Sequence, residues 1–306
     1  MKLKKFLALT AAVVMTMSMA VGCGSDDSNG NGGSNDAENK TTEFDASYEI
    51  SVVSREEGSG TRGAFIELFG IEQKDANGEK VDYTTTEADF TNSTSVMLST
   101  VAGDEYAIGY VSLGSLNDTV KALKVDGVEA TEANIKAGTY KAARPFNIAT
   151  KGDVSEVAQD FIDFILSTEG QAVVSENGYI ALDDVKPYAG SKPAGKIVVA
   201  GSSSISPVME KLKEAYLKIN TGAEIEIQTL DSSTGMTMTA EGTCDIGMAS
   251  RELKDTEINN GLTGTVIATD GIAVIVNKAN TLDDITSEQV KNIYVGDVLT
   301  WDEITE

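Results

Sequence analysis

The chain has 306 residues and a formal net charge of −24, with 24 Lys and Arg against 48 Asp and Glu. So much negative charge repels the phosphates of nucleic acids and anionic lipids, which argues against a polyanion-binding surface. The sequence contains no histidine, which excludes Ser-His-Asp and Cys-His catalysis and histidine-ligated zinc.

The first stretch of the chain has the pattern of a secretory leader. Three lysines among the first five residues precede an apolar run over 6–21 that is short for a membrane span. The run ends in Val21-Gly22-Cys23, which resembles the processing site of bacterial lipoproteins, where cleavage before a cysteine leaves that cysteine carrying lipid. We expect a signal peptide over 1–22 and lipid on Cys23; an ordinary secreted protein is the alternative.

Residues 23–47 have the composition of a flexible tether, because Gly, Ser, Asn and acidic residues dominate and apolar residues are nearly absent. We therefore expect a domain held by the lipid on Cys23 at the outer face of the cytoplasmic membrane, on the extracellular or periplasmic side. Cys244 then has no disulfide partner, and its surroundings lack a cation, which favours a packed rather than a reactive thiol.

From Ser47 onward, short apolar runs alternate with amphipathic ones, which is typical of α/β domains with largely parallel sheets. Strand-like runs lie at 50–53, 107–111, 196–200, 224–228 and 271–276, and helix-like runs at 63–70, 154–168, 206–219 and 286–294. The helix at 206–219 has one apolar face, formed by Val208, Leu212, Ala215, Tyr216 and Ile219. A Pro- and Gly-rich stretch, 186–195, separates two halves of the chain.

Three segments rich in Ser, Thr and Gly each follow a strand and precede a helix. They are 54–62, 201–207 and 231–235. Glycine lets the backbone approach a ligand, and hydroxyls and free N–H groups at a helix start donate toward negative charge. Each segment alone is an ordinary cap and turn, but three of them together with Arg55 predict an oxyanion pocket. The GxxxxGK[ST] pattern of a nucleotide-phosphate loop is absent from the sequence.

Seven segments together resemble the phosphate-binding proteins of ABC transporters. They are SREEGSGTR (54–62), AIGYVSL (107–113), RPF (144–146), VAGSSSISP (199–207), DSSTG (231–235), DIGMASREL (245–253) and DGIAVIVN (270–277). The resemblance implies a two-lobed α/β fold of the type II periplasmic-binding-protein class, in which a hinge lets the lobes close on phosphate held by neutral dipoles and one Arg.

In that family the half containing VAGSSSISP comes first, whereas here it comes second. The resemblance therefore implies a circular permutant, with 186–195 joining the usual ends; a gene shuffled or truncated from a tandem pair is the alternative. The expected lobes are 48–143 plus 280–306, which carries SREEGSGTR, and 144–279, which carries GSSSISP and DSSTG. We predict that residues near Ser47 and Glu306 lie close in space.

The resemblance also implies the ligand-binding residues. They are Arg55, Ser59, Gly60 and Thr61 from one lobe, and Ser203, Ser204, Ser232 and Ser250 from the other. Ser250 stands where known members carry an Asp that accepts the proton of hydrogen phosphate and repels sulfate, so the choice between oxyanions stays open; Asp270 or Glu57 could replace that carboxylate. Arg251 has two interpretations, an ion pair or a pocket residue, and Arg62 is expected on the surface.

The predicted function is capture of inorganic phosphate by a monomer that delivers it to the membrane subunits of an ABC importer. No cofactor or nucleic acid is expected. No metal is expected either, because the acidic runs Asp26-Asp27 and Glu56-Glu57 lack calcium-loop spacing and are expected to be solvated. The alternatives are a protein for sulfate or molybdate, and a surface sensor or adhesion module with the same fold. A phosphatase using Ser59 or Ser203 is disfavoured, since no Ser-x-x-Lys motif supplies a base in the three segments.

Overall fold

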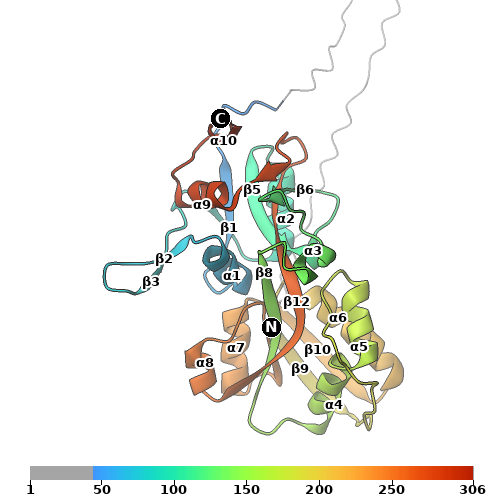
Figure 1. Ribbon diagram of the computed structural model, residues 1–306. Coiled ribbons are helices and arrows are strands. Elements are labelled where there is room, and N and C mark those ends of the chain that lie inside the picture. The colour runs from blue at the N-terminus through green and yellow to red at the C-terminus, as the bar shows by residue number, and fades with distance from the viewer. Residues whose placement is uncertain (1–43, 306) are drawn as a thin grey trace, which may run out of the picture. The chain divides into compact units, whose positions relative to one another are not determined.

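A mixed sheet of nine strands forms the centre of the part of the chain that the structure, a computed structural model, describes: residues 44–305 (Figure 1). The strand order is β10-β9-β11-β8-β12-β5-β1-β4, with β6 paired to β12. These strands are β1 (Ser51–Arg55), β4 (Asp89–Thr91), β5 (Ala107–Ser112), β6 (Lys121–Ala122), β8 (Ala143–Lys151), β9 (Gly195–Ser202), β10 (Ala223–Leu230), β11 (Ile246–Ala249) and β12 (Leu262–Val276).

Helices pack against this sheet, and two short strand pairs lie beside it. The helices are α1 (Gly60–Leu68), α2 (Thr94–Gly103), α3 (Glu132–Lys136), α4 (Glu156–Ile165), α5 (Thr168–Glu176), α6 (Ser206–Ile219), α7 (Ser232–Glu241), α8 (Asp255–Asn259), α9 (Ser287–Val295) and α10 (Asp302–Thr305), with a 3-10 turn at Leu113–Ser115. The pairs are β2 (Glu72–Lys74) with β3 (Lys80–Asp82), and β7 (Lys124–Val125) with β13 (Asp284–Ile285).

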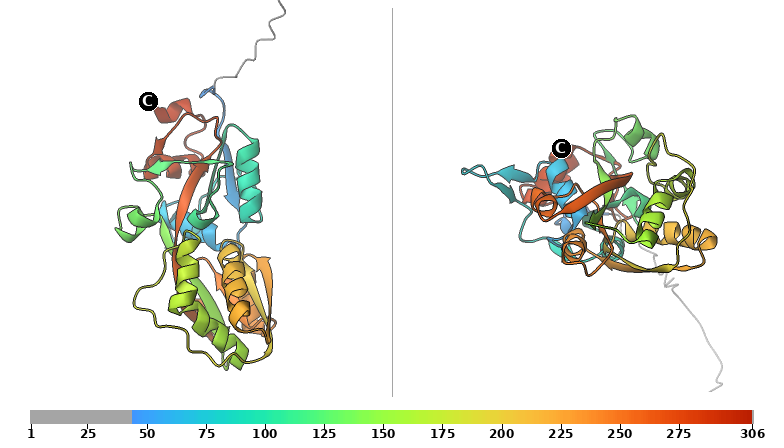
Figure 2. Two further views of the ribbon diagram at one scale, coloured as in Figure 1. Left: turned by 90° about the vertical axis from the view of Figure 1, so that its right-hand side faces the viewer. Right: turned by 90° about the horizontal axis from the view of Figure 1, so that it is seen from below.

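The two ends of the sheet are parallel, and the two strands between them are not. β1 runs parallel to β4 and β5, and β9 runs parallel to β10 and β11. β12 is antiparallel to β8 over 262–271 and then antiparallel to β5 over 272–276. One strand therefore belongs to both ends of the sheet, and it runs from one to the other (Figure 1, Figure 2).

Two main hydrophobic clusters flank this crossing. The first is built largely from residues before 143 and after 271, and it includes Phe65, Tyr110 and Trp301. The second gathers residues between 146 and 268. The side chains of 272–276, which the sequence assigns to the 144–279 lobe, pack in the first cluster, because β12 has crossed to β5 by that point.

The predicted α/β class and all five predicted strands are present, whereas β4, β8 and β11 were not foreseen. The helix expected over 154–168 is present as α4, which ends at Ile165, and a second helix that was not predicted, α5, begins at Thr168 with Ser167 as its cap. In α6, Val208, Leu212 and Tyr216 are buried as predicted. Ile219 is exposed instead, because the helix ends there and its last turn leaves the core.

The first and last described segments lie side by side. Glu49 and Thr300 form an antiparallel bridge, Ile50 N donates to the Leu299 carbonyl at 2.7 Å, and Asp302 N donates to the Ala46 carbonyl at 2.8 Å. The predicted proximity of the chain ends is therefore confirmed for these residues, while Glu306 lies outside the described range. The permuted order of the halves stays a prediction.

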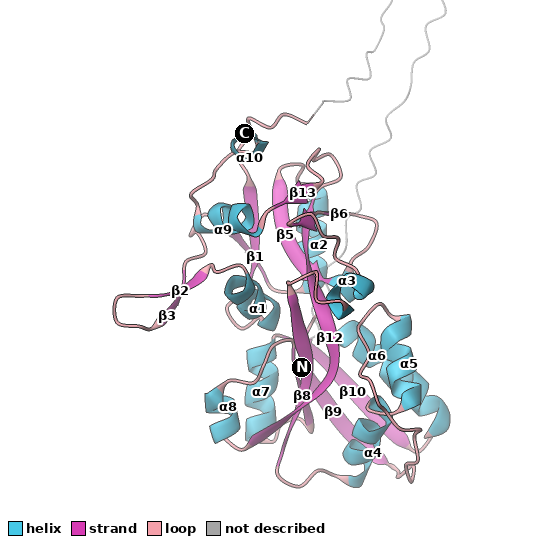
Figure 3. Cartoon of the chain, in the orientation of Figure 1, coloured by secondary structure: helices cyan, strands magenta, loops and turns pink. Residues whose placement is uncertain are grey.

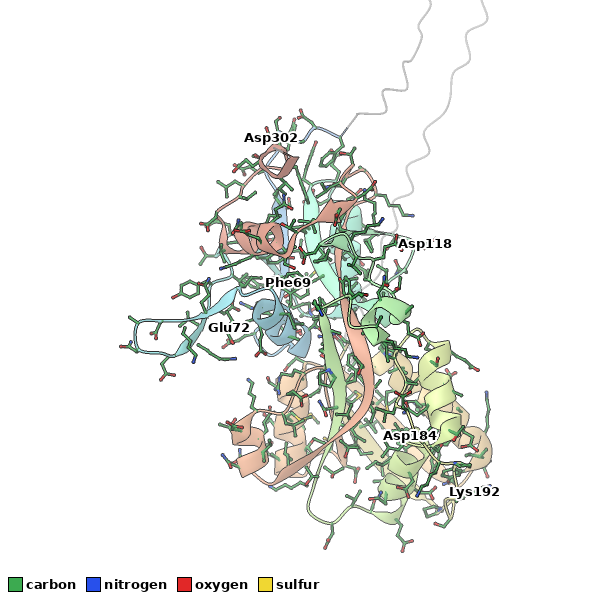
Figure 4. The ribbon with its side chains drawn as sticks, in the orientation of Figure 1. Phe69, Glu72, Asp118, Asp184, Lys192 and Asp302 are labelled. Carbon is green, nitrogen blue, oxygen red and sulfur yellow. The ribbon has the colours of Figure 1, made fainter. Side chains whose placement is uncertain are left out.

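The join at 186–195 is held against α4 by one buried carboxylate. Asp160 accepts hydrogen bonds from Tyr188 Oη at 2.6 Å, Tyr216 Oη at 2.7 Å and Ser191 N at 2.8 Å. Burial raises the pKa of Asp160, but these hydrogen bonds outweigh it and hold the pKa below its ordinary value. Figure 4 labels Asp184, just before the join, and Lys192 within it.

The leader, Cys23 and most of the tether lie outside the described residues, so those predictions are not examined by the structure. Within 44–305, none of the helices combines the length and apolar character needed to cross a bilayer.

Candidate functional site

The three predicted segments meet where the parallel strands end. β1 leads into 56–59 and α1, β9 leads into 203–205 and α6, and β10 leads into α7. β9 and β10 are parallel neighbours and end at the same edge of the sheet, which is where α/β proteins place ligands. β1 lies at the other end of the sheet and runs in the opposite sense, so its carboxyl end faces theirs. Figure 3 shows α1 above α7.

Arg55, the last residue of β1, is the cation of this site and is only 2% exposed. Glu56 binds one edge of its guanidinium, from Arg55 Nε at 2.8 Å and Nη2 at 2.7 Å. The rest of the guanidinium faces hydroxyls, with Nη2 donating to Ser203 Oγ at 3.1 Å and Nη1 to Thr94 Oγ1 at 3.4 Å. The guanidinium is thus held in one orientation, with an N–H donor directed at the 201–207 segment.

The backbone of Arg55 is also fixed. Its N–H donates to Tyr110 Oη at 3.1 Å, and Ser54 Oγ lies 2.9 Å from the same oxygen. Burial raises the pKa of Tyr110 to about 12, so the phenol stays neutral at physiological pH. Arg62 Nη1 donates to the Arg55 carbonyl at 3.0 Å. These contacts hold the end of β1, and with it Arg55, in place.

Further buried hydroxyls lie beyond the two that the guanidinium contacts. Thr61 Oγ1 lies 2.7 Å from Ser204 Oγ, and Ser250 N donates to Ser232 Oγ at 3.2 Å. Ser202 Oγ donates to Ser250 Oγ at 2.9 Å, so the Ser250 hydroxyl keeps its own proton for another acceptor. We call the buried set the hydroxyl cluster; it comprises Thr61, Thr94, Ser202, Ser203, Ser204, Ser232 and Ser250.

Gly60 brings the start of α1 against this cluster. A Cβ at Gly60 would lie 2.5 Å from Ser232 Oγ and 2.8 Å from Ser250 Oγ, so only glycine allows the approach. Ser59 caps α1 by accepting from Arg62 N at 3.3 Å and is itself buried. The structure therefore brings together all eight residues predicted as ligands, with Ser59 placed through its neighbour Gly60.

The predicted replacements for the missing pocket carboxylate are placed elsewhere. Asp270 is fully buried, but it accepts from Ser112 Oγ at 2.8 Å and from Arg144 Nη2 at 3.1 Å. Burial raises the pKa of Asp270, and the Arg144 charge opposes that rise. Glu57 is exposed. The carboxylate that reaches the site is Glu56, which the sequence analysis set aside as solvated.

The structure also decides the two ambiguous arginines. Arg251 pairs with Glu257, Nη2 to Oε1 at 2.7 Å, which matches the ion-pair interpretation. Arg62 is not the surface residue that was expected, since it pairs with Asp82 at 2.7 Å and lies 4.8 Å from the Phe90 ring centroid. Its aliphatic stem is covered because β4 passes beside the start of α1.

Two cluster members were missed by sequence reasoning. Ser202 lies within β9, one residue before those that were chosen. Thr94 belongs to the stretch Asn92-Ser93-Thr94-Ser95, which follows β4 and begins α2. That stretch has the same strand, hydroxyl and helix pattern as the other three segments, but without glycine or Arg it did not stand out.

The chemistry available here is donation to an anion. The cluster offers hydroxyls, backbone N–H groups and one guanidinium, and the Glu56 carboxylate beside it is occupied by Arg55. Among residues 44–305, no group of three or more His, Cys, Asp or Glu side chains is arranged to hold a metal ion. Cys244 is buried, and burial raises the pKa of its thiol, as expected for a packed rather than a reactive cysteine.

Comparison with known proteins gives three concordant matches. The family model described as the PBP superfamily domain matches residues 36–169 and 186–305. The phosphate-binding protein PstS 2 of Streptococcus agalactiae serotype V is 60% identical over 258 residues, which cover 84% of this chain and 88% of that protein. The phosphate-binding protein PstS 2 of Streptococcus pneumoniae serotype 4 is 46% identical over 260 residues, covering 85% and 89%.

A solved structure shares the fold. The crystal structure of a phosphate-binding protein of a phosphate ABC transporter from Streptococcus pneumoniae TIGR4 superposes with a TM-score of 0.66 and 46% identity. The match covers 84% of this chain and 99% of that one.

Proposed function

The chain belongs to the PstS phosphate-binding proteins of the PBP superfamily, and on that premise we propose that it captures inorganic phosphate between two lobes for an ABC importer. The observation that carries the proposal is the orientation of Arg55. Glu56 holds one edge of the guanidinium, and the remaining donors face Ser203 and Thr94 among buried hydroxyls. A tetrahedral oxyanion would receive charge-assisted hydrogen bonds from both sides of this site.

We infer that Arg55, Ser59, Gly60 and Thr61 bind phosphate from one lobe, and Ser203, Ser204, Ser232 and Ser250 from the other. The lobes are those proposed from the sequence, with the second boundary moved to about residue 271, where β12 changes partner. Since each lobe supplies only part of the donor set, binding favours the closed arrangement. Phosphate would thus be released when the lobes separate.

Calorimetry of the purified protein with phosphate, sulfate and molybdate tests the proposal. We expect binding of phosphate, and binding of sulfate or molybdate alone would assign a different oxyanion. Arg55→Lys keeps the charge but loses the fork, and should weaken binding by about 2 kcal/mol, or thirtyfold. Arg251→Lys makes the same change at the Glu257 pair, outside the cluster, and should leave affinity within about threefold.

The order of the halves is part of the proposal. We propose that the chain is a circular permutant whose new ends meet at Glu49 and Thr300 and whose join is held by Asp160. A single alignment over 84% of the chain supports the view that the Streptococcus agalactiae relative has the same order, which disfavours an accident of one gene. A chain reordered to begin near residue 196 and end near 186, with the segments at Glu49 and Thr300 joined instead, should bind phosphate equally well, although it lacks the contacts of Asp160 to the join.

Delivery and location complete the proposal. We propose an extracytoplasmic monomer, anchored by lipid on Cys23, that docks on the membrane subunits of the importer. Labelling with a radioactive fatty acid, lost in Cys23→Ala, tests the anchor. A sensor with the same fold would bind phosphate yet leave uptake unchanged when its gene is deleted. A phosphatase is disfavoured because Ser203 faces a guanidinium and Ser59 caps α1, so neither hydroxyl lies beside a base.

A further inference from the structure

A fourth segment, Asn92-Ser93-Thr94-Ser95, reaches the site from β4. β4 is the parallel neighbour of β1, and the register pairs Thr91 with Arg55. The two strands therefore end at the same edge of the sheet, and α2 begins beside α1 there. Ser93 caps α2 by accepting from Val96 N at 3.3 Å, which leaves Thr94 as the first helical residue.

Thr94 lies at the centre of the predicted ligands. Its side chain is buried, 6% exposed, and its Oγ1 lies 3.4 Å from Arg55 Nη1, 3.3 Å from Ser203 Oγ and 3.4 Å from Ser204 Oγ. Strong hydroxyl hydrogen bonds are about 2.7–2.8 Å long, so none of these three contacts is tight. By contrast, the neighbouring Thr61 and Ser204 hydroxyls are 2.7 Å apart and are committed to each other.

The surroundings of Thr94 form a cavity rather than packed core. A cavity of about 450 Å³ is lined by Thr94, Ser203 and Ser206, together with Ser93, Ser95 and Leu98 at the start of α2 and Pro207 and Glu210 of α6. The cavity is therefore bounded by the first turns of α2 and α6, both longer than two turns, whose free N–H groups favour negative charge, while the Glu210 carboxylate opposes it. A hydroxyl with one proton to donate lies at its inner wall.

We propose that Thr94 is a ninth ligand-binding residue, whose hydroxyl donates to an oxygen of the bound oxyanion. This inference rests on the proposed function and extends it to a second segment of the lobe that carries Arg55. Thr94 lies within reach of Ser203 and Ser204 of the other lobe, so the anion oxygen it binds is one that both lobes share. Binding of the anion by Thr94 thereby favours closure of the lobes.

The test compares three variants of the purified protein by calorimetry. Thr94→Val removes the hydroxyl at nearly constant volume and should weaken phosphate binding at least tenfold, whereas Thr94→Ser keeps the donor and should bind within about threefold of wild type. Thr91→Val is the matched control. The Thr91 hydroxyl is also buried but donates to the Ser54 carbonyl at 3.1 Å, so its loss should leave affinity within about threefold.

A second measurement separates a ligand contact from a structural one. If Thr94 binds the anion, Thr94→Val keeps the wild-type melting temperature without phosphate and loses part of the increase that saturating phosphate gives. Wild-type affinity in Thr94→Val, or an equal loss in Thr91→Val, would overturn the inference while the proposed function stands. A wild-type protein that binds none of phosphate, sulfate and molybdate would overturn both.

Discussion

Replacing Gly60 by alanine tests whether the site depends on close approach of two segments. The added Cβ would lie 2.5 Å from Ser232 Oγ, 2.8 Å from Ser250 Oγ and 3.1 Å from the Ser250 carbonyl carbon. The hydroxyls cannot simply rotate away, because Ser250 N donates to Ser232 Oγ and Ser202 donates to Ser250. The start of α1 and the Ser250 segment must therefore move apart.

The magnitude follows from the geometry. Overpacking of this size costs about 1–3 kcal/mol. That cost falls on the closed arrangement, in which the two segments touch, and it should weaken phosphate binding roughly five- to 150-fold. Gly60 has no left-handed backbone angle, and alanine is the better helix former, so the ligand-free protein should be at least as stable as wild type.

Gly63→Ala is the matched control for this experiment. Gly63 lies one turn further along α1, and a Cβ there would meet nothing closer than Arg251 Cδ at 3.9 Å. Calorimetry should give this variant the wild-type affinity, and thermal melts without phosphate should give both variants melting temperatures no lower than that of wild type. Equal affinities for Gly60→Ala and Gly63→Ala would refute the reasoning.

Three further predictions concern the carboxylates and Ser250. Asp160→Asn places an amide where hydrogen-bond donors converge and should lower the free energy of unfolding, measured with a chemical denaturant, by about 2–3 kcal/mol. Asp163→Asn, exposed on the same helix, should lower it by less than about 0.5 kcal/mol. Similar losses in both variants would contradict the role of Asp160 in holding the join. Burial raises the pKa of Glu257, but Arg251 holds that pKa below its ordinary 4.5, so the ion pair stabilises the fold above that pH. Glu257→Gln should therefore lower the free energy of unfolding by roughly 1 kcal/mol at pH 7, and this loss should shrink as the pH falls below 4.5. A loss that stays constant with pH would exclude the ion pair as its cause. Ser250→Asp should weaken the binding of sulfate more than that of phosphate, because only hydrogen phosphate brings a proton for the new carboxylate to accept. Equal losses of affinity for the two anions in competition calorimetry would place residue 250 away from the anion.

The positions of the ligand-bearing segments could be predicted from the sequence because each combines a local pattern with a simple topological rule. Segments that follow parallel strands arrive at one edge of a sheet, so 201–207 and 231–235 had to meet if β9 and β10 were parallel, as they are. The 54–62 segment follows β1, which runs in the opposite sense to β9, so this rule does not bring it to the other two, and only the shared residue pattern and the family resemblance predicted that meeting. The signal needed only strand periodicity and a run of hydroxyls and glycines. Asn92–Ser95 obeys the same rule, and it was missed because β4 has only three residues.

The identity of the carboxylate at the site could not be predicted in the same way. Glu56 and Glu57 lie within the 54–62 segment, Asp270 begins another of the segments that resemble the family, and side-chain direction separates the three. Asp270 faces Arg144 across the β8–β12 ladder and is neutralised there. Glu57 is exposed, and Glu56 folds back on its neighbour Arg55. The direction of each carboxylate depends on contacts between residues far apart in the chain, which cannot be read from a single sequence.

The course of β12 has a consequence for how the molecule comes apart. Its 15 residues supply side chains to both hydrophobic clusters, and its register shifts between Val266 and Ala268, near the crossing. Neither cluster can lose this strand without exposing part of the other, so melting should follow a single calorimetric transition rather than two. A protein built to open and close around a ligand would thus bend at one place and yet unfold as one cooperative unit.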